Sequence, residues 1–409
     1  MAASSVTPPG LSLRPYVPPT TCIRKCQNKE KLPPVSTCKT TRFNSRWNAT
    51  SEMEYLSCLG TAKRLRADVD AYLSKGMQKH LEKDTRKWAN RGVVFTTRIK
   101  QLDLVRASAD VLYNRHNSKL PSEVFVAKQD VAACRAVMAG MPLVTCRRIV
   151  AAPPRSRFSW KHLSILESSF AEILFLDNDS VPLTDPEFLF DTREFITTGA
   201  VLWPDMLGPA CDPEVVSVWS SGSPSSALYG VFGLRRDPAL WSHSQEVEAG
   251  QMLFNKRRHY RAIRLSHYLT EHGLAQQFAY GDKDTFRYSF LGLRSPFELA
   301  DFPAFAGRQD GRHFHRCYIA HRWHGEVLFL HGGKKEGHCS GATTFTLSET
   351  RDFRPLGGDC VPGNGSAWDM EDLEASGKYR HRPFPLWDRH HQFWQESLLG
   401  AGATLEKFL

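Results

Sequence analysis

The sequence predicts an α/β fold with a mostly parallel central sheet, and two observations lead to this prediction. Short apolar segments that suit strands alternate with helical segments, which is typical of parallel strands joined by crossover helices. In addition, the apolar run at residues 173–176 (ILFL) leads directly into Asp177, Asn178 and Asp179. Such a run is too short for a helix and suits a buried strand. Because ligands of open α/β sheets bind at the carboxyl ends of strands, we expect the functional site here.

The chain before this strand divides into three parts. Residues 1–55 are rich in Pro, Ser and Thr, which favours a disordered stem or linker. Residues 56–90 place apolar side chains at helical spacing among many charges and predict a helical stem. The α/β pattern then begins at residue 91. Its expected elements are strands at 91–97 and 124–126, helices at 102–113, 130–138 and 160–170, and a mixed segment at 143–149.

The chain beyond the acidic cluster predicts further elements of the same domain. They are a strand at 198–203, a basic amphipathic helix at 252–269, a helix that begins near residue 282, and an apolar strand at 326–331 (EVLFLH). We expect the domain to extend to residue 350, and residues 351–409 to pack on it as a C-terminal extension.

Composition narrows the function classes. The 409 residues carry 53 Lys and Arg against 43 Asp and Glu, a formal charge of +10. These basic residues are scattered, so we expect no nucleic-acid partner and favour a site for an anionic nucleotide diphosphate. The 10 cysteines permit full pairing in an oxidising compartment. No apolar run of about 18 residues and no signal-peptide core is visible, so we expect no membrane anchor within this sequence.

Two carboxylates form the first candidate site. Asp177 and Asp179 stand two residues apart at a strand end and can hold a hard divalent cation, which can bind a diphosphate. The alternative is that they only cap a turn. Asn178 lies in an N-x-S/T sequon, as do Asn48 and Asn364, and we expect it to be unmodified if this loop binds metal.

Three other segments carry candidate residues. His331 ends an apolar strand and can supply a nitrogen ligand to a metal, whereas Lys334 and Lys335 follow two glycines and can approach a phosphate. A purely structural His331 is the alternative. Trp203 and Asp205 (WPD) suit a sugar platform, because C–H faces stack on indole and Asp accepts hydroxyl hydrogen bonds; the alternative is a core Trp with a turn Asp. Finally, Asp282 and Asp284 flank Lys283 at the start of a helix.

Five ordered blocks together resemble a known family. They are SSFAEILFLDNDSVPLTDPEFLF, TGAVLWPD, EAGQMLFNKRRHY, YGDKDTF and GEVLFLHGGKK. This order resembles the fungal Golgi α-mannosyltransferases of glycosyltransferase family 71, which build mannan. The resemblance implies a GT-A-type catalytic domain at residues 91–350 and a retaining transfer of α-mannose from GDP-mannose with Mn²⁺. It also implies a mannosylated glycan acceptor on a glycoprotein, an α-1,2 or α-1,3 linkage, and residence in the Golgi lumen as a type II membrane protein.

The resemblance also implies roles for individual residues. Asp177 and Asp179 match the D-x-D motif for metal and nucleotide, with His331 as the third metal ligand. The diphosphate is expected near Lys161, Lys334 or Lys335. The sugar or acceptor is expected near Trp203 and Asp205. Asp282, Lys283 and Asp284 are the expected catalytic residues beside the donor sugar, where Asp282 or Asp284 would stabilise an oxocarbenium-like state; the alternative is that the leaving diphosphate itself deprotonates the acceptor hydroxyl. Gln251 belongs to the E-x-G-Q block with Glu248 and Gly250; we group it with the substrate residues, although the role of the block is open.

Two alternatives and one departure accompany this interpretation. The segment LFLDNDSV also resembles the first motif of haloacid-dehalogenase-like phosphatases, but there the strand comes first in the domain, whereas here a long α/β stretch precedes it. A non-catalytic sugar-binding relative is the second alternative. The departure is Ala320-His321, where many members of the resembled family have Gln, so acceptor preference is expected to differ.

Overall fold

The computed structural model describes residues 49–83, 88–150, 156, 158–205, 231–232, 247–275, 282–310, 313–332, 344–350, 367–369 and 379–384. Its helices are α1 (Ala49–Ala71), α2 (Met77–Lys83), α3 (Leu102–Asp110), α4 (Val131–Val137), α5 (Ser159–Glu167), α6 (Arg193–Thr198), α9 (Lys256–Glu271) and α10 (Lys283–Gly292). Its strands are β1 (Ala89–Thr96), β2 (Ser122–Val126), β3 (Val144–Arg148), β4 (Phe170–Leu176), β5 (Ser180–Pro182), β6 (Ala200–Pro204), β7 (Val247–Asn255), β8 (Glu298–Leu299), β9 (Asp301–Asp310), β10 (His313–Trp323), β11 (Glu326–Gly332), β12 (Thr346–Thr350), β13 (Ala367–Asp369) and β14 (Tyr379–Pro383).

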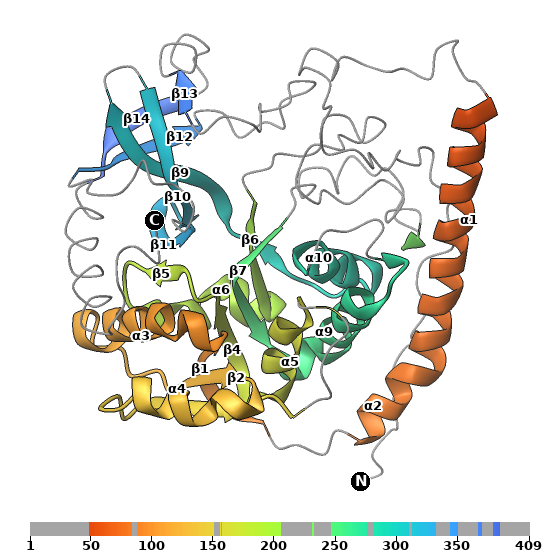
Figure 1. Ribbon diagram of the computed structural model, residues 1–409, viewed down its shortest axis with the longest axis horizontal. Helices are drawn as coiled ribbons and strands as arrows, with labels where there is room; N and C mark the ends of the chain where they lie inside the picture. Colours follow the sequence, from red (N-terminus) through yellow and green to blue (C-terminus); the bar gives the residue numbers. More distant parts are fainter. Residues whose placement is uncertain are drawn as a thin grey trace.

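The first sheet is the mostly parallel sheet expected from the sequence (Figure 1). Its strand order is β3-β2-β1-β4-β7-β6-β8, and neighbouring strands from β3 through β4 are parallel. Strand β7 is antiparallel to both of its neighbours, β4 and β6. The strand that precedes the D-x-D segment, β4, therefore lies at the centre of the sheet, between β1 and β7.

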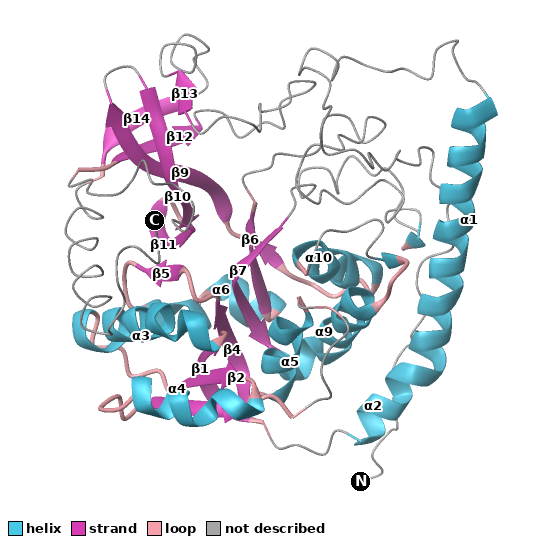
Figure 2. Cartoon of the chain, in the orientation of Figure 1, coloured by secondary structure: helices cyan, strands magenta, loops and turns pink. Residues whose placement is uncertain are grey.

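Helices cover both faces of this sheet (Figure 2). Alternate residues of a strand point to opposite faces, and β4 follows this rule. Leu174 and Leu176 pack with α3 and α4 on one face. Ile173 and Phe175 pack with α5, α9 and α10 on the other. The continuous apolar run ILFL is thus explained by a strand that is buried on both faces.

A second sheet is antiparallel and was not anticipated as a separate unit. Its strand order is β14-β12-β9-β10-β11-β5, and β13 pairs with β10. The apolar strand ending in His331 belongs here as β11. Strand β5 directly follows the D-x-D segment and pairs with β11, so that Ser180 lies opposite His331. This pairing joins the two sheets at the acidic loop.

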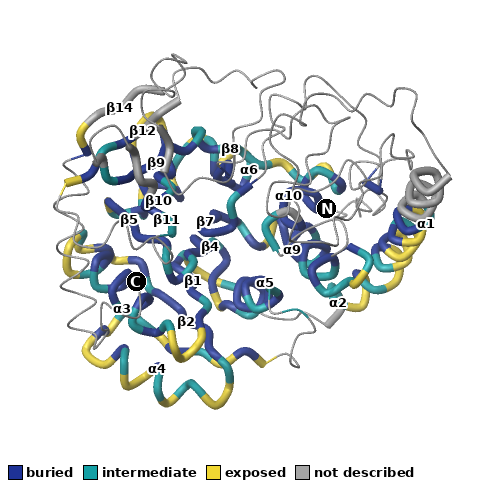
Figure 3. The backbone as a smooth tube through the Cα atoms, turned by 45° about the horizontal axis from the view of Figure 1, so that its top comes forward, coloured by how far each residue is buried: buried dark blue, intermediate teal, exposed yellow. Residues whose placement is uncertain are grey.

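The N-terminal helices pack along the edge of the molecule beside α9 and α10. Their apolar stripe includes Leu65, Val69 and Leu73, and it meets Leu265 and Leu269 of α9. Figure 3 shows the opposite side of these helices exposed. The helical segment expected before residue 91 is therefore present, and it contributes to a core instead of lying free. None of the helices in the described residues is long and apolar enough to span a bilayer.

Two element predictions are corrected. Residues 252–255 belong to the end of β7, not to the helix, because their side chains continue the two buried faces of the sheet. Residues 144–148 form the edge strand β3 in place of a mixed segment. The stem expected at 1–55 lies outside the described residues up to residue 48, as does most of the extension expected at 351–409.

One disulfide bond lies within the described region. Cys134 of α4 and Cys146 of β3 are bonded. It ties a helix to the edge strand of the parallel sheet. Disulfide bonds persist in oxidising compartments, which agrees with the even cysteine count.

Candidate active site

The D-x-D loop is held in place by backbone hydrogen bonds from two sides. Asp177 N donates to Gly250 O of β7 at 2.7 Å, and Gly332 N of β11 donates to Asp179 O at 3.2 Å. Within the loop, Ser180 N donates to Asp177 O at 3.0 Å. Both carboxylates therefore stand on a fixed backbone between the two sheets.

Three side chains of this region form a potential metal site. One ligand atom from each of Asp177, Asp179 and His331 lies within 4.8 Å of the others. The imidazole Nε2 of His331 is 3.5 Å from Asp179 Oδ1. Two carboxylates and one imidazole suit a divalent cation such as Mn²⁺, so the donor set fits the expected metal.

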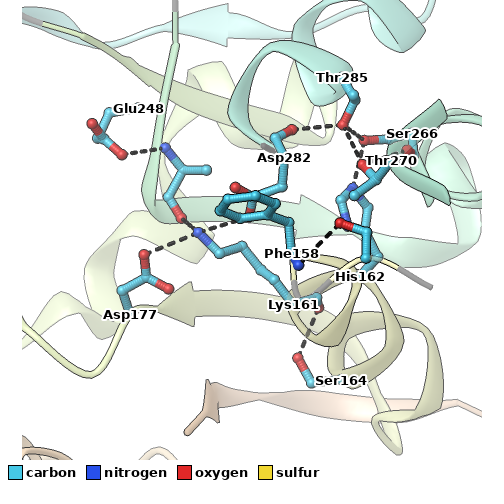
Figure 4. A network of polar contacts seen from close by, with 12 residues as sticks. Phe158, Lys161, His162, Ser164, Asp177, Glu248, Ser266, Thr270, Asp282 and Thr285 are labelled. Carbon is cyan, nitrogen blue, oxygen red and sulfur yellow. Dashed lines mark hydrogen bonds and ion pairs between the residues drawn. The ribbon is translucent and has the colours of Figure 1, made fainter. Parts of the chain in front are cut away.

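Lys161 is the cation at the base of the site (Figure 4). Its Nζ lies 2.9 Å from Asp177 Oδ2, 3.0 Å from Asp282 Oδ2 and 2.7 Å from Ala249 O. Burial alone would lower the pKa of Lys161, but the Asp177 and Asp282 carboxylates outweigh it and raise this pKa. The ammonium donates to Asp177 Oδ2 and Ala249 O and forms an ion pair with Asp282, so Lys161 holds two carboxylates together. Lys161 also lines the pocket described below, and its expected position near the diphosphate stays a prediction.

A buried chain of hydroxyl groups holds the start of α10, where Asp282 lies. Thr285 Oγ1 donates to Asp282 O at 2.6 Å and is 2.9 Å from Ser266 Oγ and from Thr270 Oγ1. Ser266 Oγ is in turn 2.7 Å from His162 Nε2, next to Lys161 on α5 (Figure 4). Asp282 is thus fixed through its side chain by Lys161 and through its backbone by this chain.

A pocket of about 320 Å³ opens over these residues. It is lined by five of the predicted residues: Lys161, Asp177, Asp179, Asp282 and His331. It is also lined by residues that were not singled out: Thr96, Thr97, Arg98, Gln101, Phe158 and Trp160. The first four end or follow β1, the parallel neighbour of β4. The rule that ligands bind at the carboxyl ends of strands points to them once the strand order is known.

Asn178 faces the same pocket but is largely buried. Its Nδ2 donates to Thr97 Oγ1 at 3.4 Å. A glycan on this amide would have to displace the loop, so the burial agrees with an unmodified sequon. Asn48 and Asn364 lie outside the described residues.

The WPD pair has a different role from the expected sugar platform. Trp203 has no exposed surface and packs edge-to-face on Phe329, while its Nε1 donates to Arg322 O at 3.1 Å. A residue with no accessible face cannot stack on a sugar, so this prediction is wrong for Trp203. Asp205 is 4 % exposed and forms an ion pair with Lys283. That pair ties β6 to α10.

The remaining predicted residues fall into two groups. Gln251 is fully buried, and its Oε1 accepts from Ser180 Oγ at 3.3 Å. It therefore stabilises the end of the D-x-D loop from the protein interior and does not reach substrate. The expectation that Gln251 contacts substrate is therefore corrected. The side chain of Asp284, and Lys334 and Lys335 in full, lie outside the described part of the chain.

Comparison with known proteins identifies the family. Residues 90–321 match the family described as "Mannosyltransferase putative", which is more than half of the chain. The chain belongs to this family. The mannosyltransferase family match spans β1 to β10 and contains both D-x-D carboxylates, Lys161 and Asp282. It removes the phosphatase alternative.

Individual relatives are α-1,2-mannosyltransferases of yeasts. MNN24 of Candida albicans is 28% identical over 229 residues, which are 48% of this chain and 32% of that protein. MNN22 of the same organism is 30% identical over 164 residues, 33% of this chain and 28% of that protein. MNN2 of Saccharomyces cerevisiae is 25% identical over 189 residues, 39% of this chain and 31% of that protein. The matches span about a third of the length of these curated relatives.

Two of the solved structures to which the chain is similar are glycosyltransferases. Mouse xyloside xylosyltransferase 1 has a TM-score of 0.35 and 14% identity, covering 52% of this chain and 86% of that one. The galactosyltransferase LgtC, in complex with donor and acceptor sugar analogues, has a TM-score of 0.32 and 15% identity, covering 51% and 73%. These scores are too low to carry an argument. The strand order of the first sheet, with the acidic loop after its central strand, confirms the α/β class with a mostly parallel central sheet that was expected from the sequence.

Proposed function

We propose that this protein is a metal-dependent, retaining α-mannosyltransferase that moves mannose from GDP-mannose to a mannosylated glycan. The observation that carries the proposal is the convergence of Asp177, Asp179 and His331 on one pocket, in a chain of the mannosyltransferase family. The fold alone would not support it, since one fold hosts many functions.

The metal-binding residues in this proposal are Asp177, Asp179 and His331. A bound divalent cation would supply positive charge that stabilises the departing diphosphate. Lys161 orients Asp177 and Asp282 within the pocket and balances their charge. The Asp282 carboxylate then contributes negative charge next to the expected position of the donor sugar.

The nucleotide is proposed to occupy the part of the pocket that follows β1. Phe158 and Trp160 offer aromatic surface for a base, and Thr97 and Arg98 offer polar groups for the ribose and phosphates. Apart from Asp177, Asp179 and Asp282, the described residues that line the pocket include no carboxylate that could act as a nucleophile. We therefore favour a mechanism in which the leaving diphosphate deprotonates the acceptor hydroxyl on the same face of the sugar, which gives retention.

The linkage and compartment are proposed from the relatives. MNN24, MNN22 and MNN2 are all named α-1,2-mannosyltransferases, so the α-1,2 linkage is the first to test, before α-1,3. A glycoprotein glycan in the Golgi lumen is the proposed acceptor. The Cys134–Cys146 disulfide supports an oxidising compartment of this kind.

The decisive experiment measures nucleotide release by the 409-residue chain. GDP-mannose, UDP-glucose and UDP-galactose are offered separately, with α-mannobiose as acceptor and with Mn²⁺ or EDTA. We expect release from GDP-mannose alone, stimulated by acceptor and lost in EDTA. Binding of GDP-mannose without any release would instead support the non-catalytic sugar-binding alternative.

We predict that the affinity for Mn²⁺ rises with pH. Burial alone would lower the pKa of His331, but Asp179 and Glu248 outweigh it and raise this pKa to about 9. Asp177 also raises the pKa of His331. The ring of His321 is a further titratable neighbour, and its centroid lies 6.0 Å from that of the His331 ring. Below pH 9 the cation must displace a proton from His331, so affinity should increase about tenfold per pH unit between pH 6.5 and 8.5.

This pH dependence is measured by Mn²⁺ titration at pH 6.5, 7.5 and 8.5. In His331→Ala we expect weaker binding at every pH and a much smaller dependence on pH. A pH-independent affinity in the wild-type chain would return His331 to a structural role.

A further inference from the structure

The E-x-G-Q block has no part in the chemistry proposed above. Each of its residues nevertheless contacts the D-x-D loop or a side chain that packs against this loop. The block occupies β7 at residues 248–251. Ala249 O accepts from Lys161 Nζ at 2.7 Å, and Gly250 O accepts from Asp177 N at 2.7 Å. Gln251 Oε1 accepts from Ser180 Oγ at 3.3 Å. This part of β7 is therefore the platform on which the site is built.

Glu248 is the residue of this block that faces His331. Its Oε1 accepts from Ala249 N at 2.8 Å, which fixes the carboxylate, and lies 3.9 Å from His331 Nδ1. The Nδ1 atom is buried and has no hydrogen-bond partner among the described residues. The other ring nitrogen, Nε2, faces Asp179. The two nitrogens of His331 thus face carboxylates on opposite sides of the ring.

Gly250 explains how the ring comes so close to β7. A Cβ at this position would lie 2.7 Å from both Cε1 and Nδ1 of His331, a distance that real Cβ contacts essentially never show. Any side chain here would push the imidazole away from the strand. Glycine therefore permits this close contact between the ring and β7.

We infer that Glu248 is a positioning residue that orients His331 for metal binding. A histidine ligand commonly donates its second N–H to a carboxylate, which fixes the tautomer and leaves the other nitrogen free for the metal. Here Nδ1 faces Glu248 at 3.9 Å and Nε2 faces Asp179 at 3.5 Å, so in a metal-bound state Nδ1–H would point to Glu248 and Nε2 would be free for the cation. The inference rests on the proposed metal dependence.

The test measures Mn²⁺ affinity by electron paramagnetic resonance, with no donor or acceptor present. Removal of such a partner typically weakens metal binding about 10–100-fold, and we expect this loss for Glu248→Ala. Glu248→Gln retains an oxygen that can accept from Nδ1–H, so it should lose clearly less. Pulsed electron paramagnetic resonance should show a hyperfine coupling between a histidine nitrogen and Mn²⁺ in the wild type, and a weaker coupling in Glu248→Ala.

Glu326→Gln is the matched control, because this glutamate is exposed at the start of the strand that carries His331. It should bind Mn²⁺ like the wild type. Unchanged affinity in Glu248→Ala would overturn the inference, as would equal losses in the Ala and Gln variants, since charge alone would then explain them. If Glu248→Ala does not fold, unchanged affinity and nitrogen coupling in a folded Glu248→Gln support the inference, and a loss of that coupling overturns it.

Failure of the metal site itself gives a different result. If the wild-type chain binds no Mn²⁺, both the metal assignment and the role of Glu248 are wrong. Mannosyl transfer in the presence of EDTA would then show that the proposed reaction survives without them.

A second variant probes the same contact from the backbone side. Gly250→Ala should lower Mn²⁺ affinity, because the new methyl group displaces the His331 ring. Gly273→Ala is the control, since its Cβ would meet no atom within 4 Å. Mn²⁺ titration and thermal melting of both variants separate a local loss of metal affinity from general destabilisation; equal Mn²⁺ affinities in the two variants would contradict the geometry.

Discussion

Replacing Asp179 with alanine should lower mannosyl transfer by about a thousandfold or more while leaving the protein folded. The loss follows from removing one of the three proposed metal ligands, because a bound cation would contribute several kcal/mol of charge stabilisation to the transition state. The fold should survive, since Asp179 lies at a strand end. Burial and then repulsion from Asp179 raise the pKa of Asp177, so removing Asp179 relieves a repulsion. Initial rates of GDP release, with circular dichroism as the check on folding, measure both effects.

The control for this variant is Asp191→Ala. Asp191 is an exposed aspartate whose ion pair with Arg91 lies on the surface, and such pairs contribute at most about 1 kcal/mol. Its transfer rate should equal that of the wild type. Full activity in Asp179→Ala would remove the D-x-D loop from the metal site and return it to a turn-capping role.

The acidic loop could be predicted because its signals are local. An apolar run followed by Asp177 and Asp179 predicts a buried strand that ends in two carboxylates, and the structure confirms the strand. His331 is a candidate from its position at the end of an apolar strand, but its contact with Asp179 depends on the pairing of β5 with β11. That pairing joins segments far apart in the chain and has no signature in either segment alone.

The predictions that failed are those that depend on what packs around a side chain. Trp203 lies near the end of a strand and next to a carboxylate, a pattern that suits both a sugar platform and a core residue. In the structure, Phe329 and Trp323 of the second sheet pack on Trp203, which is therefore a core residue. For Lys161, the resemblance implies a position near the diphosphate, which stays a prediction. Only the positions of Asp177 and Asp282 around its ammonium reveal that it holds the acidic groups together.

Lys161→Met should have the largest effect on stability. The side chain of Lys161 is 11% exposed, and its loss leaves the Asp177 and Asp282 carboxylates, which are 23% and 14% exposed, without their cation. Breaking a buried ion pair by removing one partner typically lowers the free energy of unfolding by about 3–5 kcal/mol. We expect a loss of this order at pH 7.5 without metal, together with the loss of transfer activity. Urea unfolding of the variant and the wild type measures it.

The same variant should respond to Mn²⁺ and to pH in a defined direction. Burial already raises the pKa of Asp177, and Lys161 lowers it, so Asp177 should take up a proton more readily in the variant. The difference in stability should therefore shrink as the pH falls to 5, and also when Mn²⁺ replaces the missing positive charge. Lys128→Met, at an exposed lysine far from these carboxylates in the sequence, should show neither response. A deficit in Lys161→Met that is the same at pH 5, at pH 7.5 and with Mn²⁺ would mean that lost packing, not the unpaired carboxylates, destabilises the variant.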